Sequence, residues 1–130
     1  MIDKFPSKPY TINFEDHLTY LYALVHSDKY GYEILAQFLR EIADECKKRK
    51  FKQVLIEENI SATTSITDVF RIASELSQFG FSRIRMAYVD RFSEQKDINE
   101  FGRMVAVNRG VNVAVFDSVD EADKWLSEKG

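Results

Sequence analysis

Residues 53–68 read QVLIEENISATTSITD, and this stretch carries the clearest signal for a parallel α/β fold. Its first part, Gln53 to Glu57, is an apolar run of the kind that predicts a short buried strand. A helical pattern starts near Asp68, and five hydroxyl side chains lie between the strand and the helix. In an open α/β sheet, ligands bind where a parallel strand ends and the next helix begins. The stretch therefore predicts a strand–loop–helix unit whose loop is a candidate site.

The residues near the N-terminus predict a β-hairpin. Residues 10–14 alternate apolar and polar side chains, as a half-buried strand does, and residues 15–17 form a polar turn. Residues 18–25 are almost continuously apolar. They therefore predict a central strand that pairs antiparallel with the first.

Two helices are predicted from their caps and apolar stripes. The first is expected to begin with a cap at Ser27 or Asp28 and to end near Lys50. The second is expected to run from about residue 65 to residue 78, because apolar side chains recur there at helical spacing. Gly80 is its predicted stop.

The C-terminal third continues the alternation of strands and helices. Residues 84–89 and 111–116 predict strands, and the residues between them predict a helix that starts at residue 93. Met104 is placed on the apolar face of that helix. Residues 118–121 have the spacing of a capping box and predict the start of a last helix.

The predicted order of elements is ββαβαβαβα. Strands that alternate with helices imply right-handed crossovers and a largely parallel sheet. The predicted fold class is α/β, with a mixed sheet of about five strands that begins with an N-terminal antiparallel hairpin and continues with βα units. Residues 1–8 are predicted to be a tail and residues 9–130 a single domain.

Composition limits the classes of protein to which the chain can belong. It has 130 residues, 45% of them hydrophobic and 30% charged, as in ordinary globular domains. The formal net charge of −3 argues against general nucleic-acid binding, which requires a basic face. Cys46 is the only cysteine, and no stretch reaches the length of a membrane span. Because the N-terminus does not read as a signal peptide, a cytoplasmic protein is expected.

Three motifs near the C-terminus carry a family resemblance. Residues 88–90, Tyr-Val-Asp, close a strand, residues 108–110, Asn-Arg-Gly, end a helix, and residues 115–126 read VFDSVDEADKWL. From about Pro9 to Leu126 the chain resembles the SpoIIAA-like branch of the STAS domains, which occur in anti-sigma factor antagonists and in the cytoplasmic tails of sulfate transporters. The resemblance implies a SpoIIAA-like (STAS-like) mixed sheet with helices mainly on one side, and a binding role rather than catalysis.

The resemblance also bears on residues 61–65, which we call the hydroxyl loop. In anti-sigma factor antagonists, a partner kinase phosphorylates a serine at the start of the second helix, within an Asp-Ser-Ser-Gly or Asp-Ser-Thr-Gly motif. Here the matching residues read Ser-Ala-Thr-Thr-Ser, without the aspartate and the glycine. The binding or phospho-acceptor candidates are Ser61, Thr63, Thr64, Ser65 and Asp68.

The sequence leaves three interpretations of the hydroxyl loop open. Ser65 or Thr64 can cap the second helix, and Asp68 suits the positive end of that helix. A phosphate there would add about two negative charges beside Glu57, Glu58 and Asp68, and would switch a protein-binding surface by repulsion. Alternatively, the helix start binds an anionic ligand.

The tyrosines form a second candidate site. Tyr20, Tyr22, Tyr30 and Tyr32 cluster around the second strand and the start of the first helix. They either pack in the core or line a pocket for a flat or apolar small molecule. An edge strand or an exposed apolar face could instead serve self-association, as in a homodimer.

The sequence indicates no catalytic residues, no metal site and no cofactor. Glu57 and Glu58 are neighbours in a strand, so their side chains point to opposite faces and do not form a pair. His17 and His26 have no partner at metal-ligand spacing. Neither a nucleophile elbow nor a phosphate-binding loop is present.

The leading prediction is a non-catalytic regulatory domain, a protein-interaction module in bacterial signalling. Its surface is the hydroxyl loop and the start of the second helix. Substitutions at Ser61 to Ser65 are expected to change partner capture and not stability. The alternative is a carrier or sensor of a small apolar ligand, with a sizeable pocket lined by the tyrosines. An enzyme would need a convergent set of polar groups in a cleft.

Overall fold

A computed structural model describes residues 8–129, whereas residues 1–7, most of the predicted tail, and residue 130 lie outside the described part. The described chain alternates strands and helices after an initial pair of strands. The strands are β1 (Thr11–Asp16), β2 (Leu21–Ser27), β3 (Gln53–Ile60), β4 (Arg85–Asp90) and β5 (Val113–Phe116). The helices are α1 (Tyr32–Arg49), α2 (Ile66–Leu76), α3 (Lys96–Asn108) and α4 (Val119–Lys129), with the short helical turns η1 (Ser77–Phe81) and η2 (Ser93–Gln95).

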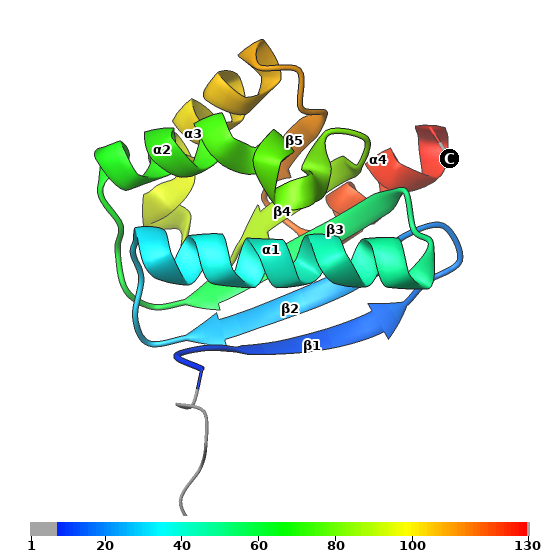
Figure 1. The fold of residues 1–130 in the computed structure, drawn as a ribbon, viewed down its shortest axis with the longest axis horizontal. Coiled ribbons are helices and arrows are strands. Elements are labelled where there is room, and N and C mark those ends of the chain that lie inside the picture. The colour runs from blue at the N-terminus through cyan, green and yellow to red at the C-terminus, as the bar shows by residue number, and fades with distance from the viewer. Residues whose placement is uncertain (1–7, 130) are drawn as a thin grey trace, which may run out of the picture.

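The five strands form one sheet in the order β1-β2-β3-β4-β5. β1 is antiparallel to β2, and the other neighbours are parallel. Each crossover from β2 onward moves one strand in the same direction, so right-handed connections place α1, α2 and α3 on one face (Figure 1). α4 follows β5 and packs on the opposite face. The predicted fold class, with its N-terminal hairpin and βα units, is confirmed.

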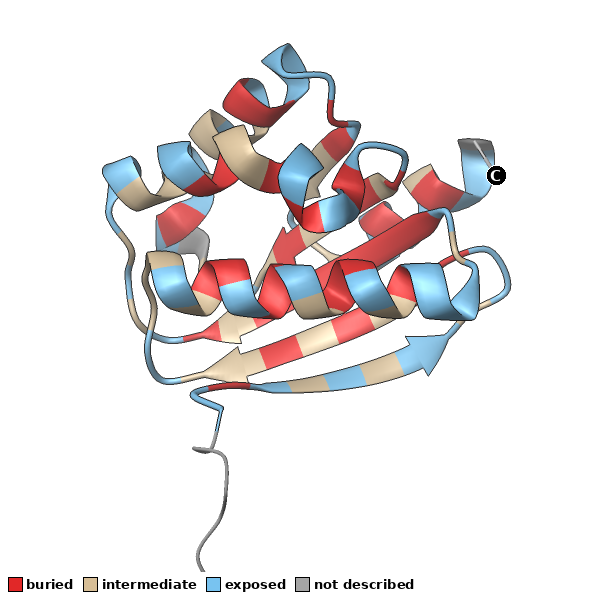
Figure 2. Cartoon of the chain, viewed as in Figure 1, coloured by how far each residue is buried: buried red, intermediate tan, exposed pale blue. Residues whose placement is uncertain are grey.

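The sheet separates two hydrophobic cores. The larger core lies between the sheet and α1, α2 and α3, and its fully buried side chains include Phe38, Ile42 and Phe81. The smaller core is built around Leu55 and Leu126, between the sheet and α4. β3 lies at the centre of the sheet with both faces covered, which explains why it is buried almost throughout (Figure 2).

The hairpin turn lies later in the chain than the sequence predicted. β1 extends to Asp16, whose partner in β2 is Leu21. The backbone N–H of His17 donates to the carbonyl oxygen of Tyr20 at 3.0 Å and closes the turn. Leu18, predicted to lie in the second strand, is 99% exposed in this turn. An apolar run does not by itself show which of its members pair with another strand.

α1 begins at Tyr32, and neither Ser27 nor Asp28 caps it. The Ser27 hydroxyl donates instead to the carbonyl oxygen of Pro9 at 2.8 Å, which ties the end of β2 to the chain before β1. Gly31 precedes the helix with φ of +144°, a conformation that glycine adopts readily. The longer loop places Tyr30 over the end of β3, where its hydroxyl meets a glutamate described below.

β3 runs to Ile60, beyond the predicted end at Glu57. Pairing with β2 continues to Ile60, which lies opposite Ser27, whereas pairing with β4 ends at Glu58, which lies opposite Asp90. The two glutamates therefore belong to the strand, and the hydroxyl loop begins after it.

α2 begins directly after Ser65, as predicted, but it ends at Leu76 rather than at Gln78. The wide turn η1 follows, and within it Gly80 has φ of +118°. A Cβ at Gly80 would lie 3.0 Å from the Cβ of Ala43, so this glycine also allows η1 to approach α1 closely.

α3 begins at Lys96, after the turn η2 rather than at residue 93. Met104 is 53% exposed and does not belong to the buried face. The buried face is instead set by the approach of α2, because a Cβ at Gly102 would lie 2.9 Å from Cγ1 of Val69. Of the predicted stripe, Val105 is buried and Phe101 packs against the core, so only the placement of Met104 was wrong.

The boundaries of the last strand and helix follow from local hydrogen bonds. The N–H of Val111 donates to the carbonyl oxygen of Ala106 at 3.1 Å, so this residue closes α3 and β5 begins only at Val113. The N–H of Glu121 donates to the Ser118 hydroxyl at 3.2 Å. The predicted capping residues thus open α4.

Candidate functional site

The hydroxyl loop connects the end of β3 to the start of α2. The Ser65 hydroxyl accepts a hydrogen bond from the N–H of Asp68 at 3.1 Å, so Ser65 is the cap of α2. Ser61 and Thr63 are exposed to solvent. The Thr64 hydroxyl oxygen is buried and has no hydrogen-bond partner among residues 8–129. The loop therefore presents free hydroxyls at Ser61 and Thr63, whereas the Ser65 side chain is engaged in the helix.

Apolar side chains are exposed beside the hydroxyl loop. Ile66 and Phe70, one helical turn apart at the start of α2, are 56% and 45% exposed. The Phe70 ring stacks against Phe101 of α3 with ring centroids 6.4 Å apart. Met104 and Val107 of α3 are also exposed and follow Phe101 at helical spacing. We call these five residues the α2–α3 apolar surface.

Glu57 and Glu58 point to opposite faces of β3, as the strand period requires. On the α4 side, Arg91 donates from Nε to a Glu57 oxygen at 2.7 Å, and the Tyr22 hydroxyl donates to the other oxygen. The Glu57 charge is thus paired with a guanidinium instead of facing the hydroxyl loop. Of the three carboxylates predicted to lie beside the hydroxyl loop, Glu57 is therefore paired, and only Asp68 lies at the start of α2.

Glu58 lies on the side of the three helices and is fully buried. One carboxyl oxygen accepts from the Tyr30 hydroxyl, and the other has no hydrogen-bond partner among the described residues. Burial raises the pKa of Glu58 to about 8; the Tyr30 hydrogen bond lowers this pKa and the nearby Asp90 raises it. The carboxyl is therefore mostly protonated at neutral pH.

Asp90 is the neighbour of Glu58 on the adjacent parallel strand, and the register places both side chains on one face. Asp90 accepts hydrogen bonds from the N–H of Phe92 and the Asn99 amide, both at 2.9 Å, and from the Gln95 amide at 3.3 Å. Burial raises the Asp90 pKa, although these hydrogen bonds lower it. The sequence does not reveal this carboxyl pair, because only the register of β3 and β4 brings the two residues together.

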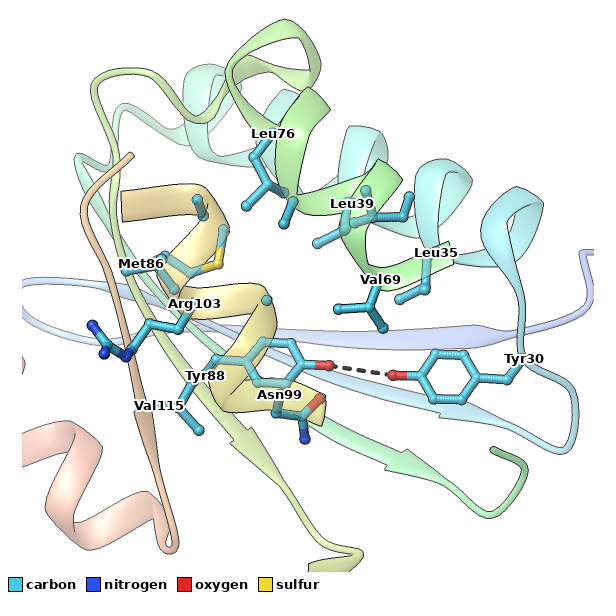
Figure 3. Close-up of a pocket in the computed structure, with 15 residues that line it drawn as sticks. Tyr30, Leu35, Leu39, Val69, Leu76, Met86, Tyr88, Asn99, Arg103 and Val115 are labelled. Carbon is cyan, nitrogen blue, oxygen red and sulfur yellow. Dashed lines mark hydrogen bonds between the residues drawn. The ribbon is translucent and has the colours of Figure 1, made fainter. Parts of the chain in front are cut away.

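A cavity of about 80 Å³ lies on the same face, between the sheet and the helices. Its walls are apolar and include Leu35 of α1, Val69 of α2 and Met86 of β4 (Figure 3). At one end the hydroxyls of Tyr30 and Tyr88 point toward each other and are 3.4 Å apart (Figure 3). The cavity thus combines an apolar body with one polar end.

Only one of the four predicted tyrosines lines this cavity, namely Tyr30. Tyr20 and Tyr22 lie on the opposite face of the sheet, where Tyr20 donates to Asp123 of α4 at 2.7 Å. Tyr32 packs at the edge of the larger core, where its hydroxyl donates to Glu75 of α2 and the Arg71 guanidinium carbon lies 3.7 Å from its ring centroid. The four tyrosines therefore do not form one pocket. Tyr20 and Tyr22 lie on the α4 side of the sheet, and only Tyr30, in the loop before α1, reaches the cavity.

The sequence reasoning missed Tyr88, Asn99 and Gly102, which also line the cavity. Tyr88 precedes Asp90 by two residues in β4, so period two places both on one face. That spacing was a usable signal for Tyr88. No local signal marks Asn99 and Gly102, because their position depends on how α3 crosses α2.

Another cleft, of about 660 Å³ and with a mixed polar and apolar lining, lies at the ends of β4 and β5. The helices that follow these strands leave to opposite faces of the sheet, an arrangement that commonly opens a crevice. Its cations are paired: Arg91 with Glu57 at 2.7 Å, and Lys96 with Asp117 at 3.3 Å. The cleft therefore offers little unpaired positive charge to an anion.

The histidines and the cysteine, which are the residue types most often used in metal binding and nucleophilic catalysis, make structural contacts in this fold. His17 lies 2.9 Å from a Glu15 oxygen, and His26 lies 3.1 Å from the Asn59 amide. Within residues 8–129, no three His, Cys, Asp or Glu side chains gather as metal ligands would. Burial raises the pKa of the Cys46 thiol to about 12, as expected of a core residue. None of the helices in the described part is long and apolar enough to span a bilayer.

Two solved structures resemble this fold. An anti-sigma factor antagonist from Mycobacterium paratuberculosis matches with a TM-score of 0.64 and 10% sequence identity, over 94% of this chain and 97% of that chain. The protein TM1081, solved by NMR, matches with a TM-score of 0.52 and 13% identity, over 98% of this chain and 94% of that chain. No protein-family model matches the sequence, and no curated protein matches it significantly. The likeness extends over almost the whole chain, and it shows that this chain has the STAS-like α/β fold.

Proposed function

We propose that this chain is a non-catalytic regulatory domain that binds a protein partner through the hydroxyl loop and the α2–α3 apolar surface. The observation that carries the proposal is the exposure of Ile66 and Phe70 directly after that loop. The similar mycobacterial protein is an anti-sigma factor antagonist, named for its action on another protein, which supports a role in protein binding.

Phe70 has the properties of an anchor for a partner. Its ring is held between Phe101 and the Arg109 guanidinium, whose carbon lies 5.3 Å from the ring centroid. A side chain that is already held in place loses little conformational entropy when a partner covers it. Aromatic anchors of this kind often dominate the binding energy of an interface.

The carboxyl groups at the strand ends support a binding role over a catalytic one. Glu57 is held by Arg91 and Tyr22, Glu58 is enclosed beside Tyr30, and Asp90 accepts three hydrogen bonds from its own loop and α3. These contacts position the carboxyl groups within the fold instead of directing them to a substrate.

The exposed hydroxyls suggest how the surface would be regulated. Phosphorylation of Ser61 or Thr63 would add about two negative charges to the loop that leads into α2. A partner that covers the apolar side chains at the start of α2 would then have to bury or approach that charge. We therefore expect a phosphate on either residue to weaken partner binding.

The test is a partner identified by crosslinking in the native host, then purified and titrated against the chain by calorimetry. We expect Phe70→Asp to weaken the affinity at least about tenfold, because the anchor is lost and a charge is placed in the interface. The matched control is Leu18→Asp, which places the same charge on an exposed apolar residue at the opposite edge of the sheet.

Two outcomes would contradict the proposed surface. One is wild-type affinity in Phe70→Asp. The other is an equal loss of affinity in Leu18→Asp, which would show that added charge alone weakens binding. Circular dichroism of both variants establishes that each is folded before the titration.

A further inference from the structure

The geometry points to a second binding site: the cavity between the sheet and α2 and α3 takes a small uncharged molecule with an apolar body and one hydrogen-bond acceptor. This inference stands apart from the partner surface, because the cavity lies on the inner side of α2, whereas Phe70 faces outward. Failure of the proposed function would therefore leave it intact.

The size and walls of the cavity define the apolar part of the ligand. Protein interiors are close-packed, with few voids larger than a water molecule, so an apolar void of about 80 Å³ is unusual. Ala73 of α2 and Ala106 of α3 line it with small side chains that leave room between the helices and the sheet. An apolar cavity of roughly 150 Å³ accepts benzene, so about half that volume suits a molecule of three or four heavy atoms.

The polar end defines the hydrogen-bonding group of the ligand. The single proton of the Tyr30 hydroxyl is donated to Glu58. The Tyr88 hydroxyl has only a long contact of 3.4 Å to Tyr30. Because the Tyr30 proton goes to Glu58, the Tyr88 hydroxyl is the donor in this long hydrogen bond, and it can exchange that weak bond for one to a carbonyl, ether or hydroxyl oxygen inside the cavity.

The surroundings select against charge on the ligand. The Asp90 carboxyl lies on the face of the sheet that carries Tyr88, so it disfavours an anion near the polar end, whereas the buried Glu58 carboxyl beside it is mostly protonated and adds little charge. The one cation that lines the cavity, Arg103, is paired with Glu100 at 2.6 Å. A charged ligand would also lose its hydration against apolar walls.

The test uses the full chain with isotope-labelled methyl groups, observed by NMR during titration with propan-1-ol, propylammonium, propionate or xenon. We expect propan-1-ol and xenon to shift the methyl signals of Val69, Leu76 and Met86 in a saturable way. A ligand of this size is expected to bind in the millimolar range. Propylammonium, which matches propan-1-ol in shape but carries a charge, and propionate, which carries the opposite charge and one more heavy atom, are expected to leave these signals unchanged.

The variant Tyr88→Phe distinguishes the contribution of the hydroxyl at the polar end from the contribution of the apolar walls to ligand binding. We expect it to raise the dissociation constant of propan-1-ol about threefold to tenfold and to leave that of xenon unchanged. The matched control is Tyr22→Phe, which removes a hydroxyl on the opposite face of the sheet. Ala73→Val and Ala106→Val fill the cavity from two different helices, and each should weaken both ligands.

Each contrary result overturns a stated part of the inference. Absence of saturable shifts with both propan-1-ol and xenon would show that the cavity does not admit ligands. Tighter binding of propylammonium would identify a cation site that uses Glu58 and Asp90. Equal propan-1-ol affinity in wild type and Tyr88→Phe would exclude the hydrogen bond at the polar end.

Discussion

At Glu58, one carboxyl group makes the stability of the fold depend on pH. This carboxyl group is buried on the helix side of β3. One of its oxygens accepts a hydrogen bond from the Tyr30 hydroxyl, and the other has no hydrogen-bond partner among residues 8–129. Burial raises its pKa from the ordinary value of 4.5 to about 8. The folded chain therefore keeps a proton over a range of pH in which the unfolded chain releases it.

We expect the free energy of unfolding to fall as pH rises from about 4.5 to about 8, because unfolding then releases the Glu58 proton. The contribution of this group reaches at most about 1.4 kcal/mol per pH unit. Glu58→Gln does not titrate, so its stability should increase relative to the wild type as pH rises. Urea unfolding between pH 5 and pH 8, as approximate limits, measures the difference.

Glu33→Gln is the control, because Glu33 lies on the exposed side of the first turn of α1. It should keep the slope of the wild type. If Glu58→Gln also keeps that slope, the carboxyl is ionised in the folded chain, and the protonated state described here is wrong.

At the scale of a single element, the start of α2 shows how one loop can hold both structural and exposed hydroxyls. Ser65 satisfies a free N–H of the first helical turn, whereas Ser61 projects from the loop into solvent. The expectation that all substitutions from Ser61 to Ser65 leave stability unchanged therefore needs revision. The structure separates a capping position from positions that are exposed to solvent and make no helix cap.

Ser65→Ala is expected to reduce the free energy of unfolding by about 1 kcal/mol, because the N–H of Asp68 loses its acceptor. Ser65→Asp keeps an acceptor at the cap and should retain most of the stability. Ser61→Ala should be neutral. Urea unfolding of the three variants decides between these effects, and an unchanged midpoint for Ser65→Ala would show that the cap contributes nothing.

On the scale of the whole molecule, the consecutive strand order makes the two edges of the sheet different from its centre. β3 has a neighbour on each side and a helical layer on each face, whereas β1 is bonded only to β2. Outward backbone groups of an edge strand are open to water or to another chain. β1 and β5 are therefore the two strands of this sheet whose outer edges are not paired within it.

Native-state hydrogen exchange should follow this order. We expect the amides of β3 to exchange only through global unfolding, and the outward amides of β1 to exchange at least about 100-fold faster. Measurement at low protein concentration tests the isolated fold. Protection of the β1 amides equal to that of β3, at low concentration, would contradict the edge position; protection that appears only at high concentration would indicate pairing with a second copy.

Local patterns determined much of this molecule without tertiary information. The apolar run at residues 53–57, the helical stripe of α1 and the capping residues Ser118 and Glu121 each produced the predicted element. Their order, with the right-handed connection rule, was enough for a largely parallel sheet led by a hairpin, whereas helices mainly on one side were implied by the family resemblance. These features follow from side-chain period and capping, which act over a few residues.

The tertiary structure alone decided which residues form the candidate sites. The register of β3 and β4 places Glu58 beside Asp90, and the crossing of α2 over α3 exposes Met104 and opens the cavity beside Tyr88. The predicted tyrosine pocket was not assembled for the same reason. Contacts between residues far apart in sequence depend on register and helix crossing, which the packing of the complete core fixes and no short stretch encodes.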